Sequence, residues 1–169
     1  MSRPGRLPLF LFLFALAVRA VHLVQIHDCP YFDRILPAFD QHNFHVGAAA
    51  FARGDWMASS SNEAYSPLYK YALGGIWKLT LGASFRELPE EAWRAFVKDG
   101  FSPGLDETPA FLLARGVHLL LGAVLALLLF LETRRYFSER VAVISSLLYA
   151  LCGPMLFHEA LLSREFPAT

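Results

Sequence analysis

The chain has 169 residues, of which 55% are hydrophobic and 18% are charged, and its net charge is zero. Soluble domains are usually about 45–50% apolar and about 25% charged, so this composition argues against an ordinary soluble domain. The balanced charge also argues against a nucleic-acid-binding protein, which needs a basic surface. We therefore expect an integral membrane protein.

The first apolar block, residues 7–26, predicts a transmembrane helix because it is near the length that spans about 30 Å of hydrocarbon. A cleaved signal peptide is the alternative, but no small-x-small cleavage site follows the block. We favour an uncleaved signal anchor. Arg19 lies in the outer half of this helix, and we expect its side chain to snorkel to the headgroups rather than face the protein interior.

Residues 39–54 predict a helix that begins at Asp40 and ends at Gly54. The Asp40 side chain can cap the first turn, and a glycine commonly closes a helix. The apolar face repeats at helical spacing and contains Phe44, Ala48 and Phe51. The segment is too polar to span the bilayer, so we expect it to lie along the membrane surface. A loop, residues 55–66, follows it.

Residues 67–81 predict a second interfacial helix, opened by Pro67 at the first helical position. The alternative is a short transmembrane helix. One predicted face is apolar and consists of Leu68, Ala72, Gly75, Ile76 and Leu79. The other is a predicted amphipathic belt for the membrane interface, consisting of Tyr69, Lys70, Tyr71, Trp77 and Lys78.

The rest of the chain predicts a polar segment and two further spans. Residues 83–110 read as a soluble insertion with one short helix. Residues 111–131 form the second predicted span, and 132–140 a short basic turn. Residues 141–157 form the third predicted span, with a kink expected near its end, at Gly153-Pro154.

Basic residues orient these spans. Arg3 and Arg6 precede the first span, and the turn 132–140 contains three arginines, so both regions are predicted to be cytoplasmic. Residues 27–110, which contain more acidic than basic side chains, then lie outside. The predicted fold is an all-α membrane protein with three transmembrane helices and a large extracytoplasmic loop containing interfacial amphipathic helices.

An ordered set of short motifs runs through most of the chain. The first helix ends with an arginine, and a Gly-Asp-Trp and a Pro-Leu-Tyr segment follow it. The second span opens with an arginine, and a Gly-Pro and an aromatic-x-Glu segment come last. The matching residues are Arg19, Asp40-Gln41, Phe44, Ala48-Ala49-Ala50, Gly54-Asp55-Trp56, Tyr65 to Tyr71, Arg115, Gly122, Arg134 to Phe137, Gly153-Pro154 and Phe157 to Leu162.

With these motifs the chain resembles the integral-membrane GT-C glycosyltransferases that use polyprenyl-phosphate sugars, the relatives of protein O-mannosyltransferases and of the lipid A aminoarabinose transferase. The chain departs from the family pattern at Gln41, where an acidic residue is common, and at His118, where glutamine is expected. The family has more spans, so we expect residues 1–169 to be the N-terminal part of one GT-C transmembrane domain, inactive by itself.

The resemblance implies a hexosyl- or pentosyl-type glycosyltransferase in a multi-pass bacterial inner membrane, with a cytoplasmic N-terminus. Its partners would be a polyprenyl-phosphate-linked sugar donor, membrane lipids, and a protein, lipid or glycan acceptor, with protein glycosylation as one example. A non-enzymatic small membrane subunit or a transporter fragment is the alternative.

The family pattern also implies site residues. Asp40 would be the catalytic base, and Glu159 a second acidic catalytic residue. Arg115 would bind phosphate, although an arginine here can instead snorkel. The other substrate-binding candidates are Gln41, Tyr65, Pro67 and Tyr69, and an aromatic interfacial belt is the alternative reading of the last three.

His42 and His45 follow Asp40 at metal-ligand spacing. The two histidines are three residues apart, so they can share a helix face and could bind a divalent metal. Since no second ligand cluster accompanies them, we expect no certain cofactor and keep the divalent metal as a weak alternative.

Overall fold

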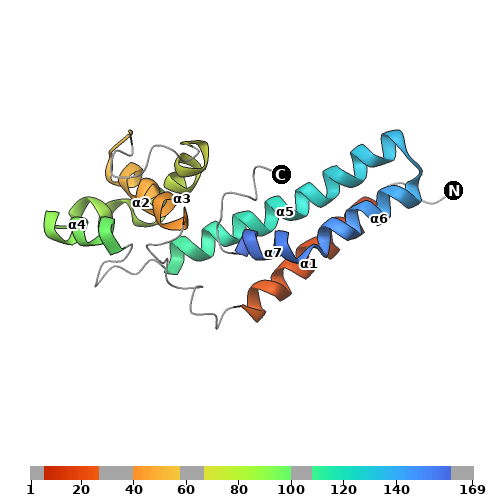
Figure 1. Ribbon diagram of the computed structural model, residues 1–169, viewed down its shortest axis with the longest axis horizontal. Coiled ribbons are helices and arrows are strands. Elements are labelled where there is room, and N and C mark those ends of the chain that lie inside the picture. The colour runs from red at the N-terminus through yellow and green to blue at the C-terminus, as the bar shows by residue number, and fades with distance from the viewer. Residues whose placement is uncertain (1–5, 27–39, 58–66, 100–107, 161–169) are drawn as a thin grey trace. The chain divides into compact units, whose positions relative to one another are not determined.

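The computed structural model describes residues 6–26, 40–57, 67–99 and 108–160, without the side chains of residues 40–41, 67, 108 and 157–160. Every regular element in this part of the chain is an α-helix, which confirms the all-α prediction (Figure 1). The helices are α1 (Arg6–Gln25), α2 (Asp40–Arg53), α3 (Pro67–Glu87), α4 (Glu90–Asp99), α5 (Thr108–Tyr136), α6 (Glu139–Ala150) and α7 (Gly153–Ala160).

The chain divides into two compact units, and α5 contributes to both. Unit 1 contains residues 1–28 and 115–160, and unit 2 contains residues 29–114 and 161–169. Within the described residues, α1 and the part of α5 from Pro109 to Tyr136 are long and apolar enough to cross a membrane. These two helices coincide with the first two predicted spans.

The third predicted span, residues 141–157, is not one helix. Instead α6 ends at Ala150 and α7 begins at Gly153. Pro154 explains the break, because it has no N–H to donate to the carbonyl four residues earlier, at Ala150, and its ring clashes with that carbonyl. At about 1.5 Å per residue, neither helix alone covers about 30 Å of hydrocarbon. The interruption falls beside the Gly-Pro pair where a kink was expected.

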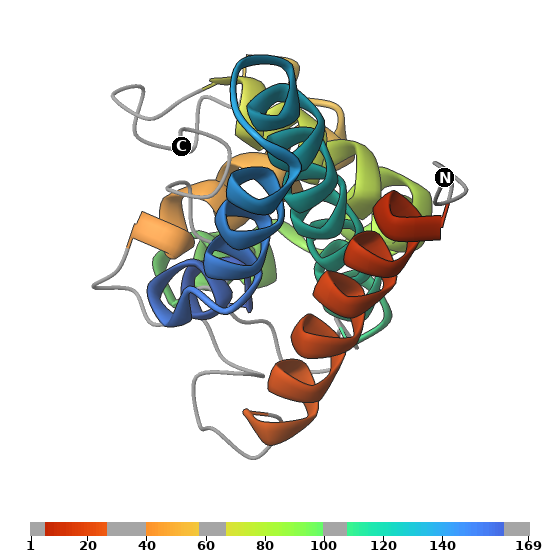
Figure 2. The ribbon, with the colours of Figure 1, turned by 90° about the vertical axis from the view of Figure 1, so that its right-hand side faces the viewer.

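Small side chains bring α1, α5 and α6 together in unit 1. One buried cluster consists of Ala15, Ala123, Ala126 and Ala150. The hydroxyl of Ser146 on α6 donates to the carbonyl of Ala126 on α5 at 2.9 Å. Small residues and a buried interhelical hydrogen bond are typical of helices that pack within a membrane. The three helices run side by side in two perpendicular views (Figures 1 and 2).

The buried clusters also give the helix directions. Leu11 packs with Phe130 and Ala142. One turn further along α1, Ala15 packs with residues that come earlier in α5 and later in α6. Thus α5 is antiparallel to α1, and α6 is parallel to it. The outward faces of all three helices are apolar and include Leu13 on α1, Leu128 on α5 and Leu148 on α6.

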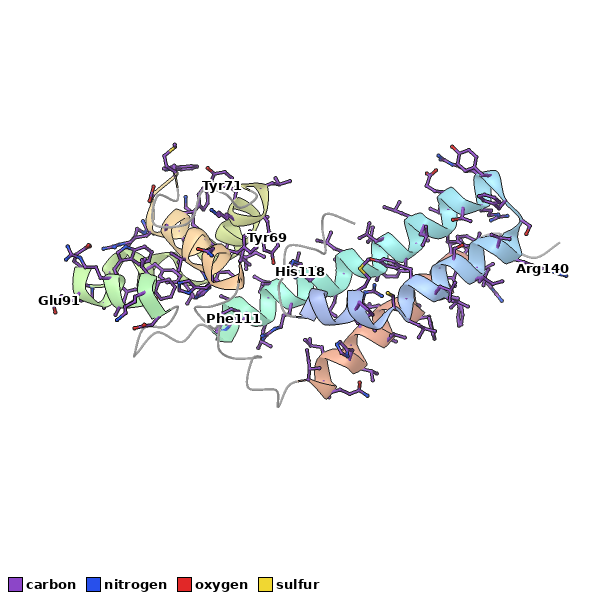
Figure 3. The ribbon with its side chains drawn as sticks, in the orientation of Figure 1. Tyr69, Tyr71, Glu91, Phe111, His118 and Arg140 are labelled. Atoms are coloured by element: carbon purple, nitrogen blue, oxygen red, sulfur yellow. The ribbon has the colours of Figure 1, made fainter. Side chains whose placement is uncertain are left out.

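The basic turn is shorter than predicted. We expected a turn over 132–140, but α5 continues to Tyr136, and only Phe137 and Ser138 separate it from α6. Arg135 bonds to Glu132 one turn earlier at 2.9 Å and supports this extension. The Ser138 hydroxyl accepts from the Val141 N–H at 3.5 Å and caps α6. Arg140 lies at this turn (Figure 3).

In unit 2, α2 is a core helix and not the surface helix that its sequence suggested. Every residue from Phe44 to Ala50 is buried. Most of these side chains are small, so neighbouring helices can approach α2 from several sides. The predicted end of the helix is confirmed, since Gly54 has a φ of 116° that strongly favours glycine. The N–H of Asp55 bonds to the Ala50 carbonyl at 2.9 Å, which completes a Schellman-type cap.

The belt predicted on α3 is divided between core and surface. The side chains that pack into unit 2 are buried at a spacing of four residues and are Tyr69, Leu73, Trp77, Leu81 and Phe85. The belt residues Tyr69, Lys70 and Trp77 are thus buried, whereas Tyr71 and Lys78 are exposed. On the predicted apolar face, Leu68 and Leu79 are 77% and 84% exposed, whereas Ile76 packs partly buried against the core. α3 carries apolar residues on both sides, so its pattern alone did not show which side is buried.

The segment predicted to be an insertion contributes to the core of unit 2. Trp93 and Phe96 on α4 are buried, and their rings stack at 5.5 Å between centroids. The Arg53 guanidinium lies 4.8 Å from the centre of the Trp93 ring and bonds to the Glu90 carboxylate at 3.4 Å. These contacts join the end of α2 to the start of α4, so α4 is part of the packing of unit 2.

Two adjacent glycines in α3 test the close approach of α2 and α3. A Cβ added at Gly74 would lie 2.8 Å from the Phe51 ring carbon Cδ1, whereas one added at Gly75 meets nothing within 4 Å. We expect Gly75→Ala to raise the thermal midpoint, because alanine favours a helix by roughly 0.5–1 kcal/mol over glycine. In Gly74→Ala, overpacking of about 1–3 kcal/mol outweighs this gain and lowers the midpoint.

Thermal unfolding followed by far-UV circular dichroism in detergent would measure both variants. Equal midpoints for Gly74→Ala and Gly75→Ala would contradict the close contact between Gly74 and Phe51.

Candidate functional site

The start of α2 is the first part of the candidate site. Asp40 is the first residue of the helix, as predicted, and Gln41 is the second. Phe44 is one turn further on. Its ring packs edge-on against Tyr69 at 4.9 Å between centroids. The structure therefore brings the second turn of α2 next to the first turn of α3.

The Pro-Leu-Tyr segment is divided between core and surface. Pro67 opens α3, as predicted. Tyr69 is buried against Phe44, whereas Tyr71 is 40% exposed (Figure 3). Tyr69 is thus a core residue near the start of α2 and does not belong to an interfacial belt. Tyr65 lies outside the described residues.

Trp77 holds the side chain of His45 in place. The indole N–H of Trp77 donates to Nδ1 of His45 at 3.2 Å. Since an indole nitrogen only donates, the proton of neutral His45 is on Nε2. The His45 ring also stacks on Phe111 at 5.3 Å and contacts Phe96 at 5.0 Å. These contacts make His45 a packed core residue.

His42 also bonds within unit 2. Its Nε2 lies 3.0 Å from the carbonyl oxygen of Val97, and a carbonyl only accepts, so Nε2 carries the proton. Nδ1 is buried without a hydrogen-bond partner among the described atoms. Burial lowers the pKa of His42 from its ordinary value, and His45 lowers it further. The bond to Val97 and the charge of Asp99 oppose this shift.

These contacts give no support to a metal site at the two histidines. Each histidine uses one ring nitrogen in a contact with another part of unit 2. Among the described residues, no three His, Cys, Asp or Glu side chains are grouped so that they could hold a metal ion.

The remaining predicted site residues belong to unit 1. Arg115 is the first residue of α5 that belongs to unit 1, and Glu159 lies in α7. Arg115 is buried, with 4% of its surface exposed, so it does not snorkel as the alternative reading required. His118, one turn further along the same face of α5, is also buried (Figure 3).

Arg19 is buried, contrary to the expectation that it snorkels. It is 1% exposed, and its guanidinium donates to the Ala15 carbonyl at 3.3 Å. The guanidinium carbon also lies 5.3 Å from the centre of the Tyr149 ring on α6, a cation–π contact. The sequence alone gave no sign of this contact, because Arg19 and Tyr149 are far apart in the chain.

Four basic residues belong to the same end of unit 1. Since α1 and α5 are antiparallel, the last turns of α1 and the start of the α5 segment in this unit are at the same end. Arg19 and His22 come from that part of α1, and Arg115 and His118 from that part of α5. Three of the four are buried, and the Nε2 of His22 is buried as well. Buried cations among membrane helices commonly mark a substrate or ion site.

Comparison with protein-family models, with curated proteins and with solved structures finds no match for this chain.

The half-buried His42 predicts a pH-dependent stability. Its pKa in the folded protein is below the ordinary value of 6.5. The unfolded chain therefore binds the proton first as the pH falls, and the free energy of unfolding decreases below pH 6.5. Above this pH, the contribution of neutral His42 to the free energy of unfolding is fully present.

Replacing His42 with glutamine tests this linkage. An amide can still donate to the Val97 carbonyl but does not titrate, so His42→Gln should lose less stability on acidification than the unmodified protein. Thermal midpoints measured between neutral and mildly acidic pH would show the difference. Parallel curves for the two proteins would contradict the role of His42.

Proposed function

We propose that this chain is part of a membrane glycosyltransferase that moves a sugar from a polyprenyl-phosphate donor to an acceptor on the outer face of the membrane. The burial of Arg19 on α1 and of Arg115 on α5, the two helices that are long and apolar enough to cross a membrane, is the observation that carries this proposal. A lipid-linked phosphate is an anion at membrane depth, and buried guanidinium groups suit its recognition. The apolar outward faces of α1, α5 and α6 support placement in a bilayer.

The proposed topology follows from the distribution of basic side chains. Arg134, Arg135 and Arg140 are exposed at the turn between α5 and α6, and the positive-inside rule assigns that turn to the cytoplasm. The end of unit 1 that contains Arg19 and Arg115 is then its outer end. In this arrangement α6 and α7 together form the third, interrupted span.

The proposed reaction needs a base and a cation. An acceptor hydroxyl attacks the anomeric carbon of the donor sugar, and the bond from that carbon to the phosphate oxygen breaks. Asp40 takes the hydroxyl proton as general base. Arg115 stabilises the negative charge on the departing polyprenyl phosphate. Glu159 remains the second acidic candidate.

Two aspartates in unit 2 provide a matched test of this role. Asp40→Asn should lower the rate of sugar transfer by about 10²–10⁴-fold, the usual contribution of a general base. Asp55→Asn is the control, since an asparagine can still accept from the Met57 N–H that bonds to Asp55 at 3.1 Å. The assay follows release of polyprenyl phosphate in membranes, with the chain extended by any sequence encoded downstream of residue 169.

Undiminished transfer by Asp40→Asn would refute the base assignment. Absence of transfer from every polyprenyl-phosphate donor, with normal membrane insertion, would instead favour a non-enzymatic membrane subunit.

The topology can be tested separately with compartment-specific reporters. A reporter at Ala95 on α4 should be extracytoplasmic, and one at Tyr136 at the end of α5 should be cytoplasmic. Alkaline phosphatase and green fluorescent protein fusions at each position would show this. Finding both positions on one side of the membrane would overturn the proposed topology.

A further inference from the structure

The two sides of α3 have the same apolar character but different surroundings. The inner side, from Tyr69 to Phe85, is buried in unit 2. The outer side repeats at helical spacing through Leu68, Ala72, Gly75, Leu79 and Ala83, and its two leucines are the most exposed large hydrophobic residues of α3. An exposed row of apolar residues commonly marks a surface that contacts a protein or a membrane. Something other than water is therefore expected to cover this outer side.

The loop after α2 extends the same surface. Trp56 and Met57 are 66% and 81% exposed. The Tyr71 hydroxyl donates to the Trp56 carbonyl at 3.0 Å, and Lys78 Nζ lies 5.0 Å from the centre of the Trp56 ring. Both contacts hold the loop against α3. We call Trp56, Met57 and the outer side of α3 the α3 outer surface.

The composition of this surface fits a lipid headgroup region. Tryptophan and tyrosine concentrate where bilayers meet water, and lysine can extend from such a position to lipid phosphates. No acidic residue occurs in α3 before its last residue, Glu87, whereas Lys78 and Arg86 are exposed along it. A surface for a sugar ligand would instead require acceptors and donors around the aromatic ring.

The core of unit 2 also contains the first turns of α5. Ala110, Phe111 and Ala114 are buried in it, and the Phe111 ring meets Trp77 at 5.3 Å. The apolar stretch of α5 begins at Pro109, so these turns are where that helix would enter the bilayer. The core of unit 2 therefore includes the first turns of a helix that is long and apolar enough to span a membrane, and α3 packs directly on those turns.

We propose that the α3 outer surface is embedded in the headgroup boundary of the outer leaflet, with the phospholipid bilayer as its partner. Since Tyr69 on the inner side packs against Phe44 in the second turn of α2, this contact also holds the N-terminal half of α2 close to the membrane surface. A lipid-linked donor would present its phosphate at that depth. The inference rests on the membrane insertion in the proposed function, but not on the transferase activity.

A fluorescent label at Leu79 tests this contact against a control at Arg94. The two side chains are similarly exposed, at 84% for the Leu79 residue and 79% for the Arg94 side chain. Each position is changed to cysteine in a background with Cys29→Ser and Cys152→Ser, and labelled with an environment-sensitive dye. The whole chain is then reconstituted into phosphatidylcholine–phosphatidylglycerol vesicles, and flotation confirms insertion.

We expect the Leu79 label to be quenched by lipids with a nitroxide near the headgroup, and several-fold less by aqueous iodide than the Arg94 label. Leu68→Cys is the second labelled position, in case Leu79→Cys does not fold. Equal iodide quenching at Leu79 and Arg94 in floated vesicles would overturn the proposal. Shielding from both iodide and nitroxide lipids would also overturn it, since a protein surface would then cover α3.

The quenching and transfer measurements together distinguish the proposed membrane contact from the proposed transferase activity. If Leu79 is lipid-quenched while Asp40→Asn has no effect on transfer, the membrane contact stands and the catalytic assignment fails. If the chain does not float with the vesicles, the membrane insertion and this contact both fail.

Discussion

Unit 2 depends on how closely α2 and α3 approach each other. Glycine allows that approach, because a Cβ at Gly74 on α3 would lie only 2.8 Å from the Phe51 ring carbon Cδ1 on α2. The close approach places the indole of Trp77 within hydrogen-bonding distance of His45, and Phe111 stacks on the same histidine. A buried histidine whose ring is held in this way has a fixed tautomer and orientation. The polar groups of α2 therefore take part in packing the core.

The same contact determines what α3 presents to its surroundings. Once Trp77 and Tyr69 are buried against α2, the leucines at 68 and 79 must point outward. The candidate base at Asp40 begins the helix against which Tyr69 packs. One contact between two helices thus connects the position of the α2 start, the burial of the aromatic residues and the apolar outer surface.

Unit 1 differs from unit 2 because it buries arginine side chains on long apolar helices. The alanine cluster allows α1 and α6 to approach, and Arg19 then lies over the Tyr149 ring and bonds to the Ala15 carbonyl. A guanidinium in hydrocarbon is costly, so its retention in the interior points to a task that needs positive charge. Binding the phosphate of a lipid-linked sugar is the task proposed here for Arg19 and Arg115.

The sequence by itself determined the helices and several of their ends. Residues 7–26 and 111–131 identified two helices that are long and apolar enough to span a membrane, and Asp40, Gly54 and Pro67 marked helix limits, because capping and apolar runs act locally. Only the tertiary structure decided which sides are buried. α3 is apolar on both sides, so its pattern could not identify the inner one, and His45 and Trp77 are 32 residues apart. Burial depends on such distant partners, which local periodicity does not encode.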